Sequence, residues 1–214
     1  MEGPVCPPDD PGFRLIETLH WAPDAGFRHG ARHLARLERA AARMGIDTTE
    51  VPDAMAAVRG DGPLRVRLTV AADGRAETTA APFTPLDDGA VWRVAITHHG
   101  IINADDPWRR VKSTQRGLYD AVRADLPENV DEVIFLNDRG RLCEGSITTL
   151  FVAREGHLLT PPVTEGALPG ILREVLLSEG RAREAPLEPE DLHGAELYVG
   201  NALRGVIPAR MTDD

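Results

Sequence analysis

The sequence predicts an α+β protein built from two lobes. In the first half, segments that alternate apolar and polar residues surround one amphipathic helical segment. In the second half, a helical segment precedes several short strand patterns, and between the halves the chain from residue 101 to 111 has no clear period. Helices separated from runs of strands in this way are typical of the α+β class. We therefore place a small α/β lobe at 1–102, a linker at 103–111 and a larger, strand-rich lobe at 112–214.

The small lobe is predicted to contain three strand regions and one helix. Residues 13–21 alternate as a strand does, and Pro-Asp-Ala-Gly at 23–26 predicts a turn after it. Residues 28–46 show helical spacing. The apolar stripe of this helix consists of Leu34, Leu37, Ala41 and Met44. Residues 64–80 alternate around a turn and predict a hairpin, and residues 91–100 predict a further strand.

The larger lobe is predicted to open with a helix at 113–127, capped by Ser113 or Thr114. Two hairpins follow, at 131–145 and at 147–162, the second with its turn at Arg154 to Gly156. A short helix is expected at 167–180, after a Pro-Gly entry. Residues 195–211 close the lobe with two strands separated by a Gly-Asn break.

Composition excludes several functions. Asp+Glu 34 against Lys+Arg 24 gives a net charge of −10, which disfavours binding to nucleic acid or to an anionic membrane. No apolar run approaches the roughly 20 residues of a membrane span, and the acidic, proline-rich N-terminus lacks the pattern of a secretion signal. Cys6 and Cys143 make neither a disulfide framework nor a metal site. We expect a soluble, cytoplasmic protein whose partner is a small molecule.

Lys112 is the only lysine among the 24 basic residues of the chain. Arginine replaces lysine well as a surface cation, but its guanidinium stays protonated and cannot attack a carbonyl group. A lysine amine can lose its proton and form a Schiff base. Arg109 and Arg110 precede Lys112, and the predicted helix follows it, so both neighbours favour loss of that proton. The alternative is one remaining lysine in an arginine-rich sequence.

Glu144 lies at the end of a predicted strand. Because side chains alternate along a strand, Leu142 and Glu144 point to the same face. If that face is the core, the carboxylate is buried and needs a cationic or hydrogen-bonding partner. A protonated pyridine nitrogen would satisfy it. The alternative is a solvent-exposed strand end next to Gly145.

Three further segments could bind a phosphate. The helix expected after Gly170 offers free N–H groups at its start, and Gly200-Asn201-Ala202 could present more. Arg36 lies one position from the apolar stripe of its helix and could reach inward as a phosphate clamp. The alternatives are an ordinary helix entry, an ordinary turn and a solvated helix face.

Other polar residues are less informative. His98 and His99 have no third ligand at a fitting spacing, so we predict no metal site. Tyr119 and Arg116, on the helix after Lys112, could face the same site and contact a substrate. A Schiff-base lysine, a carboxylate for a ring nitrogen, and an arginine with a helix start for a phosphate together describe a site for pyridoxal 5'-phosphate.

The chain resembles the fold-type IV pyridoxal-phosphate enzymes, which include branched-chain aminotransferases, D-amino acid aminotransferases and aminodeoxychorismate lyases. The resemblance runs in order from about Phe13 to Met211. Its segments are 15–18, 33–45, 112–123, 136–152, 158–177 and 199–209. It implies a small α/β lobe, a larger pseudo-barrel lobe, and a homodimer with its active site between the lobes near the subunit interface.

The resemblance also implies residue roles. Lys112 would attach the cofactor and act as the catalytic base, and Glu144 would pair with the pyridine nitrogen. The phosphate would be bound by Arg36 and by the start of the helix expected at 167–180, at Gly170, Ile171 and Leu172. The backbone of Asn201 and Ala202 would contribute to phosphate and substrate carboxylate binding.

Lys-Ser-Thr-Gln-Arg at 112–116, with Tyr119, is most similar to the aminodeoxychorismate lyase branch. That branch releases pyruvate from 4-amino-4-deoxychorismate and leaves 4-aminobenzoate, a folate precursor. A class IV aminotransferase acting on a branched-chain or D-amino acid is the first alternative. The second is a cofactor-binding relative without turnover. It is suggested by the short N-terminal segment and by Thr149, which stands where the family commonly has asparagine.

Overall fold

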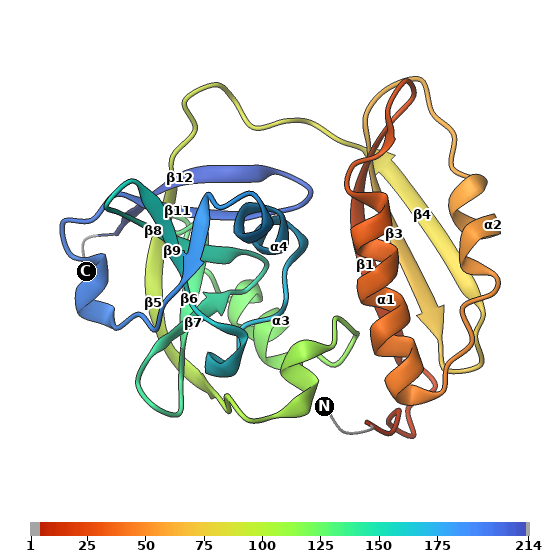
Figure 1. Cartoon of the computed structure of the whole chain (residues 1–214), viewed down its shortest axis with the longest axis horizontal. Helices are drawn as coiled ribbons and strands as arrows, with labels where there is room; N and C mark the ends of the chain where they lie inside the picture. The colour runs from red at the N-terminus through yellow and green to blue at the C-terminus, as the bar shows by residue number, and fades with distance from the viewer. Residues whose placement is uncertain (1–4, 213–214) are drawn as a thin grey trace. The chain divides into compact units, whose positions relative to one another are not determined.

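The computed structural model describes residues 5–212, so the first four residues of the predicted small lobe and the last two of the larger one lie outside it. Within this range the chain forms two compact units (Figure 1). The smaller unit runs to Pro85 and includes Val111–Gln115, and the larger unit contains Leu86–Arg110 and the chain from Arg116 onward. The α+β class is confirmed. The units differ from the predicted lobes at residues 86–102 and 112–115, for reasons of strand pairing given below.

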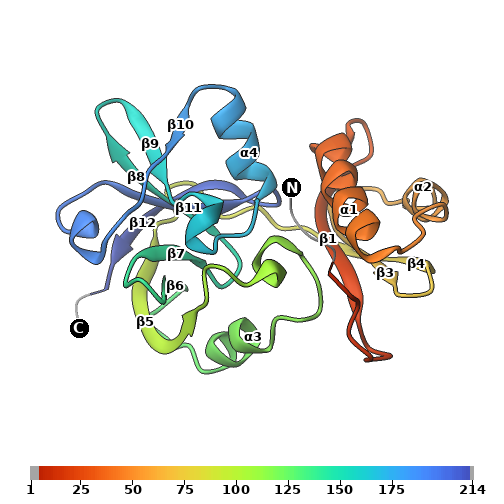
Figure 2. The same ribbon diagram turned by 60° about the horizontal axis from the view of Figure 1, so that its bottom comes forward.

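The smaller unit is a four-stranded antiparallel sheet with two helices. In spatial order its strands are β2 (Gly26–Phe27), β1 (Arg14–Ala22), β3 (Leu64–Ala71) and β4 (Ala76–Pro82). Helices α1 (Gly30–Met44) and α2 (Val51–Ala56) cover one face of this sheet (Figure 2). The predicted strand at 13–21, the helix and the 64–80 hairpin are present, whereas the short α2 carries too few residues to show a period.

Helix α1 ends where its sequence favours an end. Leu37, Ala41 and Met44 of the predicted stripe are buried. The helix ends at Gly45, which has a φ of 67°, and the Gly45 N–H bonds back to the carbonyl of Ala42 at 3.4 Å. Glycine adopts this left-handed conformation without steric cost, and it is the usual residue at the end of a helix.

Residues 112–114 run antiparallel beside β1, with an isolated bridge between Ser113 and Leu15. The Lys112 carbonyl accepts a hydrogen bond from the Ile16 N–H at 2.9 Å, and the Thr114 N–H donates to the Arg14 carbonyl at 2.9 Å. These backbone groups are therefore not available to a helix. The predicted helix at 113–127, with Ser113 or Thr114 as its cap, is wrong at its start, because α3 spans Gly117–Ala124.

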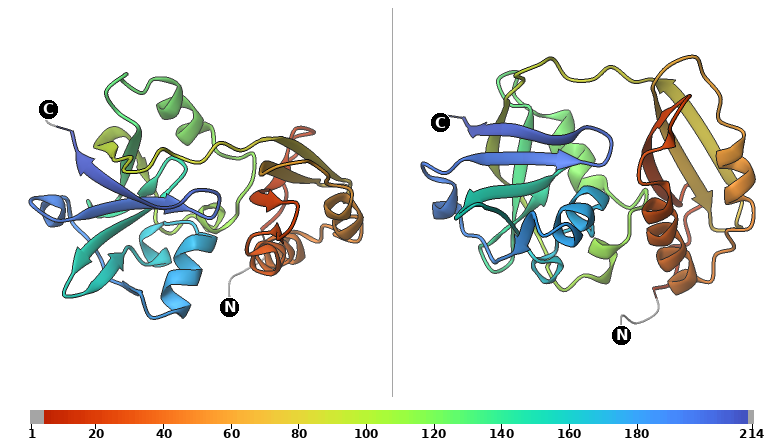
Figure 3. Two further views of the ribbon diagram at one scale, coloured as in Figure 1. Left: turned by 90° about the horizontal axis from the view of Figure 1, so that it is seen from above. Right: turned by 45° about the horizontal axis from the view of Figure 1, so that its top comes forward.

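The larger unit contains a curled eight-stranded mixed sheet (Figure 3). In spatial order its strands are β10 (Ala182–Glu184), β9 (His157–Thr160), β8 (Thr149–Arg154), β11 (Leu197–Asn201), β12 (Gly205–Met211), β5 (Trp92–Ile102), β6 (Glu132–Asn137) and β7 (Leu142–Gly145). Strand β5 is parallel to both β12 and β6. This pairing places residues 92–102 in the larger unit, although their sequence pattern continues that of the first half.

Two helices and three short 3-10 turns complete the larger unit. The helices are α3 and α4 (Ile171–Ser178), and the turns span Pro107–Arg110, Val163–Glu165 and Pro189–Leu192. The curled sheet agrees with the expected pseudo-barrel.

Apolar side chains cover both faces of strands β6 and β8 in the larger unit. On β6, Ile134 belongs to one apolar cluster and Phe135 to another, and both side chains are fully buried. A third cluster joins Phe151 of β8 to Leu172 and Leu176 of α4. Because both faces are covered, polar side chains at the ends of these strands are buried too. This arrangement determines the surroundings of the candidate site.

Candidate functional site

Glu144 is buried near the end of β7, with 8% of its surface exposed. Its Oε1 accepts a hydrogen bond from the Tyr119 hydroxyl at 2.5 Å, and its Oε2 accepts one from the Leu168 N–H at 2.9 Å. The alternative of a solvent-exposed strand end is therefore wrong. Glu144 is a buried carboxylate held from two sides, by α3 and by the segment that leads into α4.

Tyr119 comes from α3 and packs edge-on against Phe135, with the ring centres 4.9 Å apart. Burial and the charge of Glu144 raise the pKa of the Tyr119 hydroxyl, which therefore stays protonated and donates to Glu144. The Arg109 Nη1 donates in turn to the Tyr119 oxygen at 3.1 Å. Arg109 is also paired with Asp106, at 3.5 Å. Arg109, Tyr119 and Glu144 thus form a hydrogen-bonded chain.

Arg116 belongs to the same group. Its guanidinium carbon lies 5.8 Å from the centre of the Tyr119 ring, within the range of a cation–π contact. Its Nε is 2.7 Å from Asp120, and its Nη2 donates to the Ser146 carbonyl at 3.1 Å. Tyr119 therefore contacts both Arg116 and Glu144, and Arg116 has protein partners of its own. Contact of Tyr119 and Arg116 with a substrate stays a prediction.

The start of α4 lies close to two other segments. Gly170 precedes the helix with an extended backbone, and a Cβ placed on it would lie 2.9 Å from the Thr149 Oγ1. A Cβ on Gly200 would meet the Gly205 carbonyl and lie 2.7 Å from the Leu172 Cδ2. Real Cβ atoms essentially never approach this closely, so the two glycines allow α4, β8 and the β11–β12 hairpin to meet. Figure 3 shows this hairpin beside α4.

One short segment links Glu144 to this helix start. The Leu168 N–H binds Glu144, the Gly170 N–H bonds to the Leu168 carbonyl at 2.7 Å, and α4 begins at Ile171. The first N–H groups of a helix have no partner within the helix and attract anions. The distance between the Glu144 carboxylate and the first N–H groups of α4 is therefore set by the short segment from Leu168 to Ile171.

Asn201 shapes the turn between β11 and β12. Its Oδ1 accepts from the N–H groups of Leu203 and Arg204, at 3.1 and 3.0 Å, and its Nδ2 donates to the Ile147 carbonyl at 3.2 Å. Ala202, the next residue, is buried. The predicted residues Gly170, Ile171, Leu172, Asn201 and Ala202 thus lie in the same unit as Glu144.

The other predicted residues, Lys112 and Arg36, belong to the smaller unit. Arg36 is buried, so the alternative of a solvated helix face is wrong. Its Nε and Nη2 lie 2.8 and 2.6 Å from the two carboxylate oxygens of Glu17. His33 Nδ1 is 2.7 Å from the same carboxylate. Burial alone would raise the pKa of Glu17, but the charge of Arg36 and hydrogen bonds from His33 and Arg36 lower it to about 2.

Two carboxylates that organise these regions were not recognised from the sequence. Glu17 holds Arg36, and Glu132, which is fully buried, accepts hydrogen bonds from the N–H and the hydroxyl of Ser146 and from the hydroxyl of Thr148. Glu132 thereby fixes the loop that precedes Thr149. Glu17 lies between Leu15 and Leu19, at a position where the alternation of β1 predicts an apolar residue, and Glu132 begins the apolar strand β6 ahead of Val133. That pattern is the signal that could have identified them.

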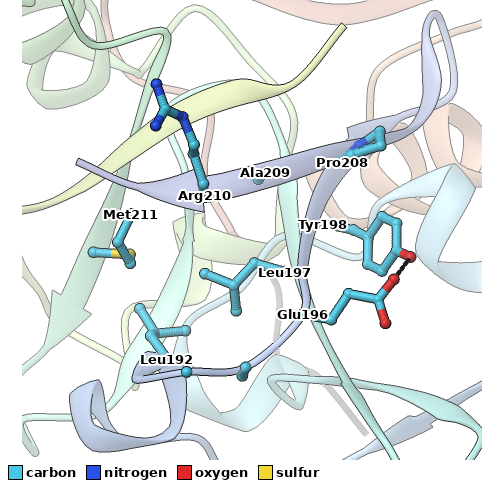
Figure 4. Close-up of a pocket in the computed structure, with 10 residues that line it drawn as sticks. Leu192, Glu196, Leu197, Tyr198, Pro208, Ala209, Arg210 and Met211 are labelled. Carbon is cyan, nitrogen blue, oxygen red and sulfur yellow. Dashed lines mark hydrogen bonds between the residues drawn. The ribbon is translucent and has the colours of Figure 1, made fainter. Parts of the chain in front are cut away.

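Other features lie apart from these residues. In residues 5–212, no helix is long and apolar enough to cross a membrane, and no cluster of three or more His, Cys, Asp or Glu could hold a metal ion. A hollow of about 320 Å³ on β11 and β12 is lined by Glu196, Tyr198 and Arg210 among others (Figure 4). None of the predicted site residues lines it.

The larger unit fits two parts of pyridoxal phosphate. A buried carboxylate that already accepts two hydrogen bonds suits a protonated ring nitrogen, because carboxylates can accept up to about four. The close approach allowed by Gly170 and Gly200 brings a helix start and a strand-connecting turn together, as an anion cradle requires. This fold and this set of donors are those expected of the fold-type IV class of pyridoxal-phosphate enzymes.

Comparison with known proteins agrees. The family model for class IV amino-transferases matches residues 14–211. A Mesorhizobium loti protein, assigned as an amino-acid aminotransferase, is 39% identical, with a TM-score of 0.87 over 94% of this chain and 100% of that chain. A Legionella pneumophila protein assigned as a 4-amino-4-deoxychorismate lyase is 18% identical over 94% of this chain and 83% of that chain, and its TM-score of 0.78 supports the fold.

Curated relatives match over a shorter stretch. A Thermotoga maritima protein assigned as a branched-chain-amino-acid aminotransferase is 33% identical over 89 residues, which are 39% of this chain. The match spans about a third, 33%, of that relative's length. From the family model, the chain belongs to the class IV aminotransferases, a family that depends on pyridoxal phosphate.

Proposed function

We propose that this chain is a pyridoxal-phosphate enzyme that removes the α-proton of a small amino substrate, with Lys112 as the catalytic residue. The observation that carries the proposal is the buried Glu144 carboxylate, linked through Leu168 to the start of α4. A family relation by itself does not require this carboxylate to be buried and hydrogen-bonded. A ring nitrogen that must stay protonated does require a buried, hydrogen-bonded carboxylate beside it.

The residues divide the work as follows. When bound, pyridoxal phosphate supplies an aldehyde for an amine and a ring that accepts electrons from the substrate α-carbon. The Lys112 amine takes the α-proton as a general base and returns it as an acid. Glu144 holds a proton on the ring nitrogen. The first N–H groups of α4, the backbone at Asn201 and Ala202, and the Arg36 guanidinium would bind the phosphate, with Arg36 still paired to Glu17 through its Nε and Nη2.

The attachment test uses the single lysine. Purified protein is loaded with pyridoxal phosphate, reduced with borohydride and digested, and the phosphopyridoxyl mass is expected on the peptide that contains Lys112. Lys112→Ala should abolish both this adduct and the visible absorption band of the bound cofactor. Arg110→Ala, two residues away, is the matched control and should retain both. An adduct elsewhere, or a band unchanged in Lys112→Ala, contradicts the assignment.

For the reaction itself we propose an aminodeoxychorismate lyase, on the basis of residues 112–116 and Tyr119. The second candidate is an aminotransferase, supported by the 39% identical Mesorhizobium protein, whose whole chain is covered. Both reactions use the same proton transfer by Lys112. They separate by co-substrate, because the lyase forms pyruvate and 4-aminobenzoate without an amino acceptor, whereas the aminotransferase requires a 2-oxo acid. Cofactor binding without turnover on either substrate set would favour the third alternative.

We also propose that the protein works as a homodimer, as the resemblance implies, and that it is cytoplasmic, as its composition suggests. Light scattering of the cofactor-loaded protein should give twice the 23.3 kDa chain mass. A monomer with full activity would contradict the dimer.

A further inference from the structure

We propose that Tyr119 is a positioning residue that keeps Glu144 ionised, so that the proton between this carboxylate and the cofactor ring stays on the ring nitrogen. The inference rests on the proposed function. It goes further because Tyr119, considered above as a substrate contact, is given a different role. Through its hydrogen bond to Glu144, Tyr119 would control how strongly that carboxylate attracts a proton.

The argument begins with the direction of the hydrogen bond. The Tyr119 hydroxyl stays protonated, so the 2.5 Å contact with Glu144 is a donation from the tyrosine to the carboxylate. A donated hydrogen bond stabilises the charged form of a carboxylate and makes it a weaker base. A bond of this kind to a charged group changes its proton affinity by about ten- to a hundredfold.

Arg109 strengthens this donation. Its N–H bonds to the Tyr119 oxygen at 3.1 Å, and its guanidinium carbon lies 5.3 Å from the centre of the Tyr119 ring. Accepting a bond from a cation polarises the hydroxyl and makes its own hydrogen a better donor. The two hydrogen bonds, from Arg109 to Tyr119 and from Tyr119 to Glu144, therefore stabilise the negative charge on the Glu144 carboxylate.

The consequence concerns a shared proton. Between a pyridine nitrogen and a carboxylate, the proton rests on the stronger base. Tyr119 and Arg109 weaken the carboxylate and so leave the proton on the nitrogen, where it makes the ring a better acceptor of electrons. Loss of the Tyr119 hydroxyl should move the proton toward Glu144 without moving the Glu144 side chain, because the Leu168 N–H still holds Oε2.

The chain offers a matched control. Its only other tyrosine, Tyr198 on β11, also donates to a glutamate, Glu196 (Figure 4). Glu196 is exposed, and neither residue belongs to the proposed site. Tyr119→Phe and Tyr198→Phe therefore make the same chemical change, once beside Glu144 and once away from it. Phenylalanine retains the packing of each ring.

The experiment loads each protein with pyridoxal phosphate labelled with ¹⁵N in the ring and measures the ring ¹⁵N chemical shift near pH 7. In Tyr119→Phe the resonance should move toward the value of unprotonated pyridine. In Arg109→Met it should move the same way by less, and in Tyr198→Phe it should not move. Exchange of the substrate α-proton with solvent should slow about tenfold or more in Tyr119→Phe only.

Several results would overturn the inference. One is a Tyr119→Phe resonance identical to that of the wild-type protein. Another is a crystal structure of this variant in which Glu144 has left the Leu168 N–H, since displacement alone would then explain the shift. If Tyr119→Phe does not fold, an unmoved resonance in Arg109→Met rejects the idea. A wild-type protein without cofactor on Lys112 rejects the proposed function and this inference with it, whereas an attached cofactor with unmoved resonances rejects the inference alone.

Discussion

The buried cluster of Glu17, Arg36 and His33 allows a quantitative prediction about stability and pH. The pKa of Glu17 is lowered from 4.5 to about 2. A depression of this size corresponds to about 3 kcal/mol of folding free energy, at 1.36 kcal/mol for each pKa unit. Because the folded-state pKa is the lower one, this contribution is fully present above pH 4.5 and is lost as the pH falls toward 2.

The perturbation is Glu17→Gln, which keeps the shape of the side chain and removes its charge. It leaves the buried guanidinium of Arg36 without a counter-ion, so the smaller unit should lose about 3–5 kcal/mol of unfolding free energy at pH 7. The matched control is Glu77→Gln on β4. Glu77 and its partner Arg75 are 60% and 58% exposed, and this change should cost less than about 1 kcal/mol.

The assay is urea unfolding followed by tryptophan fluorescence. Trp21 is the only tryptophan in the smaller unit, so a background with Trp92→Phe and Trp108→Phe reports on that unit alone. The difference between Glu17→Gln and its background should be large at pH 7 and should shrink between pH 4.5 and pH 2. A Glu17→Gln protein no less stable than Glu77→Gln, or a difference that does not depend on pH, would refute the reasoning.

Two further predictions concern the larger unit. Gly170→Ala places a Cβ 2.9 Å from the Thr149 Oγ1 and should weaken binding of pyridoxal phosphate about tenfold or more. The control is Gly62→Ala, which has open space around it and should leave the dissociation constant unchanged. Equal effects of the two changes in a cofactor titration would argue against a phosphate site at the start of α4. Cys143 is buried, and burial together with the charge of Glu144 raises the pKa of its thiol. A thiol reagent at pH 8 should therefore count one reactive cysteine, Cys6, in the folded protein and two in denaturant, and two fast-reacting thiols in the native state would contradict the buried geometry.

Much of the fold could be predicted because its signals are local. The apolar stripe of α1, the glycine after it, and the alternation of β3 and β4 each lie within a short window of sequence. The turn between β8 and β9 is equally local, with left-handed backbone at Glu155 and Gly156. The wrong start of α3 has a non-local cause, because residues 112–114 bond to β1, about 100 positions earlier in the chain.

The sequence by itself determined which residue types could serve a pyridoxal-phosphate site, because a lone lysine, a strand-end glutamate and a glycine before a helix are properties of the chain alone. Only the tertiary structure decided how those residues are held. Tyr119 lies 25 positions before Glu144 and Glu17 lies 19 before Arg36, and each pair meets only when a helix packs on a sheet. The charge state of a buried group depends on such neighbours, because desolvation and partner charges are set by packing and not by sequence order.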